Sequence, residues 1–228
     1  MPKLILVRHG QSQWNLENRF TGWWDVDLTE KGVEEAKAAG ALMREKGTFP
    51  TICFTSFQTR AIKTLHLALE EMDRLWLPVI KDWRLNERHY GGLTGLDKQE
   101  TREKHGDEQV HIWRRSFDVP PPPLEPGSPY DLSGDPRYAG VAVPHAESLK
   151  LTIERVLPYW ESAIMPVLER GESVMISAHG NSLRALVKHL SAISDEDITG
   201  LEIPTGQPIV YDLDDKGGWS QRYYLKDS

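Results

Sequence analysis

Cysteine is nearly absent from this sequence, since Cys53 is the only one among 228 residues. A single thiol excludes an intramolecular disulfide and argues against a metal centre held by thiolates. The residues around it, Thr51 to Phe54, are mostly apolar, which is typical of a buried strand. We therefore interpret Cys53 as a packing residue rather than a reactive thiol.

Long hydrophobic runs are also lacking. The longest, such as Leu4 to Val7 and Val174 to Ala178, are far shorter than the ~20 residues that cross a bilayer. The start of the chain has too short an apolar stretch, and no small-residue cleavage site, for a secretory signal. We expect a soluble cytoplasmic protein without a membrane partner.

Positive charge is in deficit, with 27 Lys and Arg against 34 Asp and Glu and a net charge of −7. This balance argues against a nucleic acid or an anionic membrane as partner, so any bound anion must meet a local basic cluster. The sequence contains no Walker-type phosphate loop, no dinucleotide fingerprint and no His-Glu-x-x-His zinc motif. We expect neither a nucleotide nor a metal cofactor.

Apolar strand patterns alternate with helical patterns along the chain, and such alternation favours parallel βαβ connections. We expect an α/β fold, a three-layer sandwich with a mostly parallel central sheet flanked by helices, in one domain over residues 1–228. The expected helices are one after the N-cap Thr29, one at 58–75, one at 146–170 interrupted at Pro158, and one after Ser182. The expected strands are 3–7, 51–56, 78–83, 173–178, 208–213 and 221–225.

An insertion at about 85–144 separates the two halves of this pattern. Its second half, Asp118 to Pro144, carries eight of the fifteen prolines, a density that excludes regular helices and central strands. Long irregular segments in compact domains are commonly active-site covers or linkers. We expect this segment, together with the stretch after Leu213, to cover a substrate.

Two short motifs resemble each other, His9-Gly10-Gln11-Ser12 and His179-Gly180-Asn181-Ser182, and each follows an apolar strand. Ligands of open α/β sheets bind outside the carboxyl ends of the strands, so the two histidines can converge there. The helix N-termini that follow offer free N–H groups to an anion. The sequence therefore predicts a phosphate site, although either histidine alone could be structural.

Two arginines strengthen this interpretation. Arg8 ends an apolar strand, where an unpaired charge would be costly, and Arg60 stands in the first turn of a helix, where the dipole disfavours a cation. A bound anion explains both, and an ordinary ion pair remains the alternative for Arg60.

The strand-end motif with Arg60 and His179 resembles the histidine phosphatase superfamily, and further blocks resemble its cofactor-dependent phosphoglycerate mutases. The resemblance covers essentially the whole chain, and its most specific blocks are Glu87 to Tyr90 and Trp113 to Arg115. The other blocks are Trp14 to Asn18, Phe20 to Trp23, Asp25 to Leu28, Thr59 to Thr64, Gly95 to Lys98, Ala178 to Ala185 and Ile203 to Gly206.

The resemblance implies an isomerase of glycolysis and gluconeogenesis that interconverts 3-phosphoglycerate and 2-phosphoglycerate. It implies a phosphohistidine at His9, a 2,3-bisphosphoglycerate intermediate that also primes the enzyme, no metal, and a homodimer or higher homo-oligomer. Glu87 would shuttle protons, and Arg8, Arg60 and a cationic His179 would stabilise the transferred group. The substrate-binding residues that it implies are Arg8, Ser12, Asn15, Thr21, Gly22, Arg60, Glu87, Arg88, Tyr90, Lys98, Arg114, Arg115, Gly180 and Asn181.

Two other functions remain open at this point, a hydrolase of the same fold and a silent phosphate-binding protein. One site geometry also supports mutase, bisphosphoglycerate synthase and phosphatase activities. The sequence departs from the family pattern at Gly92 and Asp97, and it ends at Ser228 without a Lys- and Ala-rich tail. We expect hydrolysis of the bisphosphate as a side reaction.

Overall fold

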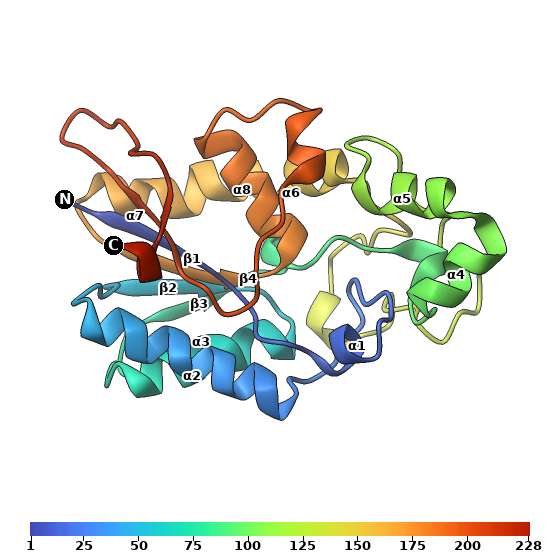
Figure 1. Ribbon diagram of the computed structural model, residues 1–228, viewed down its shortest axis with the longest axis horizontal. Coiled ribbons are helices and arrows are strands. Elements are labelled where there is room, and N and C mark those ends of the chain that lie inside the picture. The colour runs from blue at the N-terminus through green and yellow to red at the C-terminus, as the bar shows by residue number, and fades with distance from the viewer.

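The computed structural model describes residues 1–228, and its centre is a six-stranded sheet in the order β3-β2-β4-β1-β5-β6 (Figure 1). The strands are β1 (Lys3–Arg8), β2 (Ile52–Thr55), β3 (Val79–Lys81), β4 (Val174–Ala178), β5 (Ile209–Asp212) and β6 (Tyr223–Tyr224). The first four run parallel, and β5 and β6 are antiparallel to their neighbours. The expected mostly parallel sheet is confirmed, with β1 one residue longer than expected and the other five strands shorter.

Helices cover both faces of the sheet. One layer holds α2 (Glu30–Glu45) and α3 (Thr59–Glu71), and the other holds α6 (Leu149–Tyr159), α7 (Met165–Glu169) and α8 (Gly180–Leu190) (Figure 1). Strand β1 contributes to the core on both sides, with Leu4 and Leu6 facing one helix layer and Ile5 and Val7 the other. This alternation follows from the two-residue period of a strand, and it confirms the three-layer architecture. None of these helices combines the length and the apolar character that a membrane span requires.

Local signals in the sequence explain where the helices begin. Thr29 caps α2, as expected, and its hydroxyl accepts a hydrogen bond from the Gly32 N–H at 3.1 Å. The helix expected at 146–170 is not broken at Pro158, which lies inside α6. The irregularity comes just after it, as a π-helical turn over Trp160–Ile164 that leads into α7. This wide turn ends two residues before Pro166, which stands in the first turn of α7 and cannot donate a backbone hydrogen bond.

The insertion has a helical first half and an irregular second half. Two helices, α4 (Lys98–His105) and α5 (Asp107–Arg115), form the first half. The proline-rich segment 118–144 contains only a 3-10 turn at Pro136–Tyr138, as its composition predicts. Its Leu132 and Tyr138 side chains pack against Trp23 in a small hydrophobic cluster of their own.

Candidate active site

The two strand-end histidines converge, as the sequence predicts. Strands β1 and β4 pair in parallel, with Arg8 opposite Ala178, so their carboxyl ends meet at one edge of the sheet. The His9 N–H donates to the Ala178 carbonyl at 3.0 Å, and the imidazole rings of His9 and His179 lie 5.1 Å apart between centroids. Segments far apart in the chain thus build one site.

The His9 ring has the geometry of a neutral nucleophile. Its Nδ1 lies 2.7 Å from the Gly10 carbonyl oxygen, which only a protonated Nδ1 can satisfy, so the lone pair is on Nε2. The Arg60 Nε lies 3.3 Å from that Nε2. Burial, followed by the charges of Arg60 and Arg8, holds the pKa of His9 well below its usual value. The imidazole is therefore neutral at physiological pH, as expected for nucleophilic attack.

The charge state of His179 depends on its surroundings. It is fully buried, with Nε2 2.7 Å from the Ser56 hydroxyl and no partner for Nδ1. Burial and then Arg60 lower the pKa of His179 well below its usual value. The protein without a ligand therefore favours a neutral His179, because the charges that it places nearest are positive. The cationic His179 that the resemblance implies needs a bound anion to raise its pKa, and it stays a prediction.

Arg60 is a buried guanidinium whose partners are not carboxylates. Its Nη2 and Nη1 donate to the carbonyl oxygens of Gly22 and Trp24 at 2.9 and 3.1 Å. Burial lowers the pKa of Arg60 to about 10, against the opposing effect of Glu87 and Asp25, so it stays charged at neutral pH. These contacts disfavour the ordinary ion pair and aim a cation at His9.

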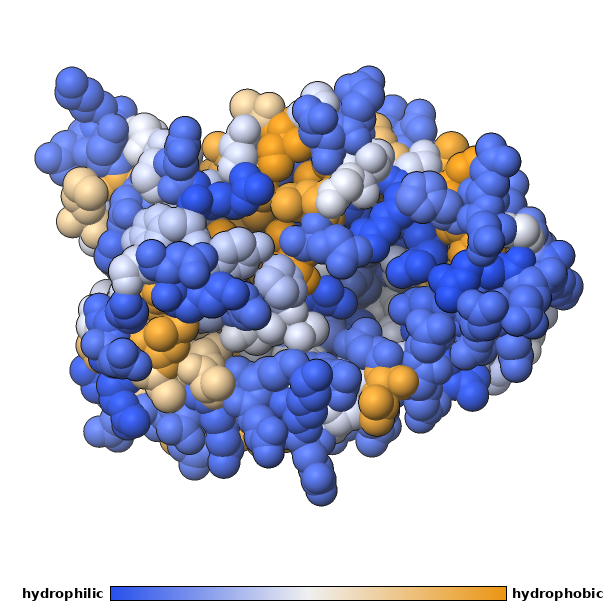
Figure 2. Space-filling view, in the orientation of Figure 1, coloured by the Kyte–Doolittle hydropathy of each residue, from blue (hydrophilic) through white to orange (hydrophobic).

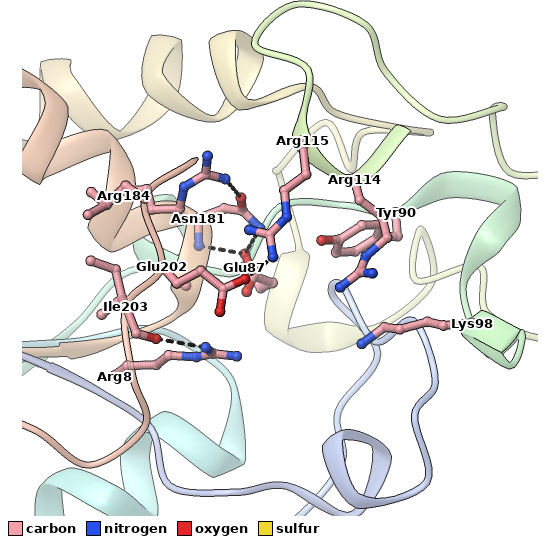
Figure 3. A pocket seen from close by; sticks show the side chains of 12 residues that line it. Arg8, Glu87, Tyr90, Lys98, Arg114, Arg115, Asn181, Arg184, Glu202 and Ile203 are labelled. Atoms are coloured by element: carbon pink, nitrogen blue, oxygen red, sulfur yellow. Dashed lines mark hydrogen bonds and ion pairs between the residues drawn. The ribbon is translucent and has the colours of Figure 1, made fainter. Parts of the chain in front are cut away.

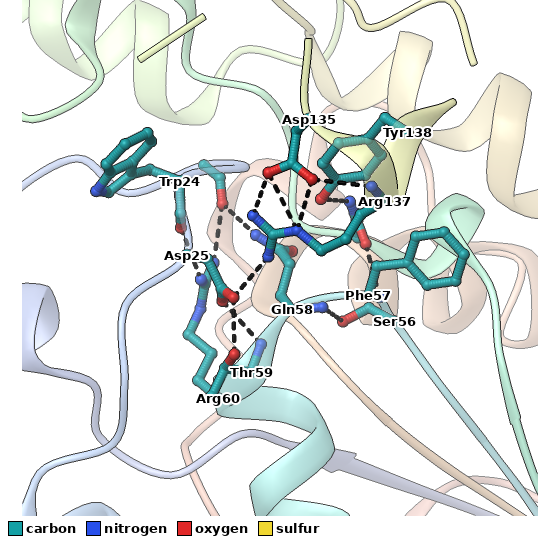
Figure 4. A network of polar contacts seen from close by, with 12 residues as sticks. Trp24, Asp25, Ser56, Phe57, Gln58, Thr59, Arg60, Asp135, Arg137 and Tyr138 are labelled. Carbon is teal, nitrogen blue, oxygen red and sulfur yellow. Dashed lines mark hydrogen bonds and ion pairs between the residues drawn. The ribbon is translucent and has the colours of Figure 1, made fainter. Parts of the chain in front are cut away.

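A polar network fixes the start of α3, which carries Arg60 (Figure 4). The Asp25 carboxylate accepts hydrogen bonds from the Thr59 N–H at 2.8 Å and the Thr59 hydroxyl at 2.7 Å. Arg137, from the proline-rich segment, donates to the same carboxylate at 2.7 Å and also pairs with Asp135 at 2.6 Å. The segment is thereby fastened to the residues that orient Arg60.

Glu87 is held inside the site by three N–H donors. Its Oε1 accepts from the backbone of Arg88 at 2.7 Å, the backbone of Asn181 at 3.1 Å and the Asn181 amide at 2.9 Å. The side chain is buried, and Arg84 pairs with Asp82 instead. Glu87 is therefore not a surface carboxylate in an ion pair with Arg84, and it is positioned to exchange a proton with a bound ligand.

Two adjoining cavities form the site, with Arg8, Glu87, Tyr90 and Lys98 in the wall of both. The larger has a volume of about 190 Å³, below the roughly 300 Å³ at which typical drug-sized sites begin, so it suits a small ligand. Figure 2 shows a hollow bordered by hydrophilic residues between α8 and the α4–α5 insertion. The larger cavity is also lined by Arg114, Arg115, Gly180, Asn181, Arg184, Leu201, Glu202 and Ile203, and the smaller by His9, Asn15, Arg19, Phe20, Thr21, Gly22 and Arg60.

The larger cavity, shown in Figure 3, is built for an anion. Five cationic side chains line it, from Arg8, Lys98, Arg114, Arg115 and Arg184. The buried Nε atoms of Arg8 and Arg184 have no hydrogen-bond partner within the protein, and such donors are costly unless a ligand accepts from them. Fork-shaped guanidinium groups of this kind suit phosphate and carboxylate oxygens.

The cationic wall also changes the acidity of its other members. Burial acts to raise the pKa of Tyr90, but the charges of Arg88 and Lys98 outweigh it and lower the pKa to about 8. Burial lowers the pKa of Lys98, and the neighbouring Arg114 lowers it further. The shift of Tyr90 shows that positive charge outweighs negative charge in this wall.

Three of the expected site residues are buried and do not line either cavity: Ser12, Arg88 and His179. The Ser12 hydroxyl caps α1 (Gln13–Leu16) by accepting from the Asn15 N–H at 3.1 Å. The Arg88 guanidinium donates to the Trp113 carbonyl oxygen at 3.0 Å, at the end of α5. In this structure Ser12 and Arg88 support residues that line the cavities.

Sequence reasoning missed Arg184 and Glu202 in the cavity wall. Arg184 follows Asn181 by nearly one turn of α8, so the two side chains lie on the same face of the helix. A charged residue in so apolar a helix could have marked Arg184 as a site residue. Its Nη1 donates to the Asn181 side-chain oxygen at 2.9 Å. For Glu202 there was no signal, because a carboxylate is unexpected beside a bound anion.

The two segments expected to cover the site contribute no lining residue to either cavity. The stretch after Leu213 pairs with β5 through β6, and the chain end meets Lys46 near the far end of the sheet (Figure 1). The expectation that this stretch covers the site is wrong. The proline-rich segment packs behind the loop that carries Trp23, and its movement stays a prediction.

Known proteins resemble this chain along its full length. The family model for the histidine phosphatase superfamily (branch 1) matches residues 4–226. Proteins named 2,3-bisphosphoglycerate-dependent phosphoglycerate mutase are 82% identical in Erythrobacter litoralis, over 100% of both chains, and 66% identical in Zymomonas mobilis, again over 100% of both. Two solved structures share the fold at 22% identity. A mycobacterial glucosyl-3-phosphoglycerate phosphatase has a TM-score of 0.72, with 96% of each chain covered. A phosphoglycerate mutase from Bacillus anthracis has a TM-score of 0.67, covering 96% of this chain and 90% of the other.

Proposed function

The chain belongs to the histidine phosphatase superfamily, and on that premise we propose that it works as a phosphoglycerate mutase, an isomerase (EC 5.4.2.11). It interconverts 3-phosphoglycerate and 2-phosphoglycerate in glycolysis and gluconeogenesis by way of a phosphorylated His9. The observation that carries the proposal is a neutral His9 facing a small cavity that adjoins a wall of five cations. That wall matches a three-carbon substrate bearing both a phosphate and a carboxylate.

The nucleophile and its surroundings define the transfer step. The Nε2 lone pair of His9 forms the new N–P bond while the phosphorus–oxygen bond to the glycerate carbon chain breaks. Arg60 and Arg8 stabilise the charge on the phosphoryl oxygens, and the His179 ring packs beside His9.

Proton transfer falls to Glu87. A departing alkoxide must gain a proton, and the hydroxyl that later attacks the phosphorylated His9 must lose one. The carboxylate keeps its position through its three N–H donors, which lets it perform both tasks in turn. Tyr90, Lys98, Arg114 and Arg115 hold the remaining anionic groups of the substrate from the opposite wall.

The bisphosphate that primes His9 fits the same residues. The unpartnered Nε donors of Arg8 and Arg184, both from residues that line the larger cavity, leave hydrogen-bonding capacity for an anionic group. When bound, 2,3-bisphosphoglycerate supplies the phosphoryl group that converts His9 to its active form. The structure holds no cluster of three or more His, Cys, Asp or Glu side chains suited to a metal ion.

A coupled assay tests the function. Conversion of 3-phosphoglycerate is followed through enolase, with and without 2,3-bisphosphoglycerate and in the presence of EDTA. We expect turnover that the bisphosphate stimulates and that EDTA leaves unchanged. Release of inorganic phosphate without any 2-phosphoglycerate would instead identify a hydrolase, and no turnover would indicate a phosphate-binding protein.

Labelling tests the nucleophile. 2,3-Bisphosphoglycerate should phosphorylate His9 to an adduct that is labile in acid and stable in base, because protonation of the ring promotes hydrolysis. Mass spectrometry should find no such label in the His9→Ala variant. An acid-labile label that persists in this variant would remove His9 from the mechanism.

We also propose that the protein is a cytoplasmic homodimer or higher homo-oligomer. Strand β3 is a sheet edge, and Ile80 on it is exposed beside Leu75 and Trp76, with 74% of Trp76 accessible. Exposed apolar residues at an open edge favour association with a second copy. Light scattering should give an oligomer for the native chain and a smaller particle for Trp76→Ser, whereas identical masses would place the contact elsewhere.

A further inference from the structure

Glu202 is one of two carboxylates in the larger cavity, among the cations that receive the substrate. Glu202 belongs to the loop between α8 and β5, and Arg115 is the last residue of α5 in the insertion. The two side chains form an ion pair from opposite sides of the larger cavity (Figure 3). The Glu202 side chain is 68% exposed and that of Arg115 is 23% exposed, so the pair stands at the mouth of the cavity.

The surroundings of Glu202 differ from those of Glu87, the other carboxylate in the wall. Glu87 has three N–H donors that define its position, whereas Glu202 has only Arg115 as a hydrogen-bond partner. Arg8 donates to the carbonyl oxygen of the next residue, Ile203, at 2.8 Å. The backbone beside Glu202 is thereby held in place while its side chain can turn away.

A carboxylate in this position competes with an anionic ligand for the same guanidinium. Ion pairs this exposed stabilise a protein by about 1 kcal/mol or less, so an incoming phosphate can displace one. A dianionic phosphate that binds Arg115 through two oxygens gains more than the monoanionic carboxylate it replaces. The displaced Glu202 then lies close to that phosphate and repels it.

We propose that Glu202 is an internal competitor for Arg115 that weakens the binding of phosphate groups and hastens the release of product. The inference rests on the proposed function for the nature of the product, but the competition itself needs only an anion. In the resting site Glu202 holds Arg115, the substrate's phosphate displaces it, and the pair re-forms as the product leaves.

The test compares Glu202→Gln with Glu172→Gln. The control removes one charge from another exposed ion pair, with Arg170, away from both cavities. Calorimetry measures the affinity for inorganic phosphate at low and high ionic strength. The coupled assay gives KM for 3-phosphoglycerate and the inhibition constant of 2-phosphoglycerate.

We expect Glu202→Gln to bind inorganic phosphate about three- to tenfold more tightly than the native protein at low salt. KM and the inhibition constant should fall by a similar factor. Screening should reduce the difference to under about twofold near 0.5 M salt. Glu172→Gln should match the native protein in all three measurements.

Equal phosphate binding by Glu202→Gln would overturn the proposal, because it would show that Glu202 does not compete with the ligand. Weaker binding would also overturn it, because it would show that Glu202 positions Arg115 for the ligand. A gain in affinity that is the same at low and high salt would also overturn it. If the native protein does not convert 3-phosphoglycerate, the proposed function fails, while the phosphate measurements still decide the role of Glu202.

Discussion

The Glu87 carboxylate offers the sharpest test of a single residue. Glu87→Gln keeps the side-chain oxygen that accepts hydrogen bonds from Arg88 and Asn181, so the site should retain its shape. The amide cannot accept or release a proton at neutral pH. We expect kcat to fall by about 10²–10⁴, the usual contribution of general acid–base catalysis, with KM nearly unchanged.

Two measurements show whether the lower kcat of Glu87→Gln comes from lost proton transfer or from a distorted site. Calorimetry should show that Glu87→Gln binds inorganic phosphate at least as tightly as the native protein, because the variant removes a negative charge from an anion-binding cavity. A kcat within about threefold of the native value would assign proton transfer to another group.

Tyr90 should give the site its sensitivity to alkaline pH. Its pKa of about 8 means that the phenol becomes a phenolate as the pH rises through that value. The added negative charge repels an anionic substrate, so KM for 3-phosphoglycerate should increase above about pH 8. By linkage, bound substrate raises the pKa of Tyr90 again.

The Tyr90→Phe variant identifies the group responsible. Its KM should stay flat through about pH 8, because phenylalanine carries no ionisable hydroxyl. A KM that still rises in the same range would show that a group other than Tyr90 titrates there.

At the scale of elements, Arg137 connects the proline-rich segment to α3. Arg137→Ala removes the contact to Asp25 but leaves the Asp25 hydrogen bonds to Thr59. Because the Arg137 side chain is 36% exposed, we expect less than about 1 kcal/mol loss in the free energy of unfolding. Limited proteolysis within 118–144 should become severalfold faster, because the segment loses its attachment.

A matched variant and a ligand complete this experiment. Arg170→Ala removes an exposed arginine from an unrelated pair and should leave the cleavage rate unchanged. If the segment closes over bound substrate, saturating 2,3-bisphosphoglycerate should slow cleavage in the native protein. Equal rates with and without the ligand would show that the segment is static.

The sequence predicted the elements well where the signal was local. Thr29 marked a helix start, and two strands ending in histidine located the site because parallel strands share one carboxyl edge. The helix continues through Pro158 and changes only at a π-helical turn two residues later, which no local pattern indicates. The ion pair of Glu202 with Arg115 depends on two chain-distant elements meeting, so only the folded structure could reveal it.

For the molecule as a whole, buried histidines should make the free energy of unfolding decrease as the pH falls. Burial lowers the pKa of His9 and His179 well below 6.5, and that of His89 to about 4. Below about pH 6.5 the unfolded chain takes up protons that the folded protein does not, so stability is complete above that pH and falls below it. Each histidine contributes a slope of up to about 1.4 kcal/mol per pH unit.

Chemical denaturation between about pH 8 and pH 5 measures this dependence. The free energy of unfolding should be level at the alkaline end and decline steadily below about pH 6.5. His89→Gln removes one of these histidines, so the slope of the unfolding free energy against pH should fall by the contribution of about one proton. His89 lies outside the two cavities, so this variant leaves their lining residues unchanged. A flat profile through this range would contradict the neutral, buried state of these histidines.

The position of β1 between β4 and β5 has a consequence for folding during synthesis on the ribosome. This strand leaves the ribosome well before its partners, because its Leu4 lies opposite Val174 on one side and Tyr211 on the other. At ordinary rates of translation these partners follow roughly 10 to 40 s later. Until then the nascent chain carries an apolar strand with two open edges, a form that invites aggregation. Chaperone engagement should therefore be strongest before β4 emerges, and catalytic competence can arise only after β4 and the His179 that follows it have left the ribosome.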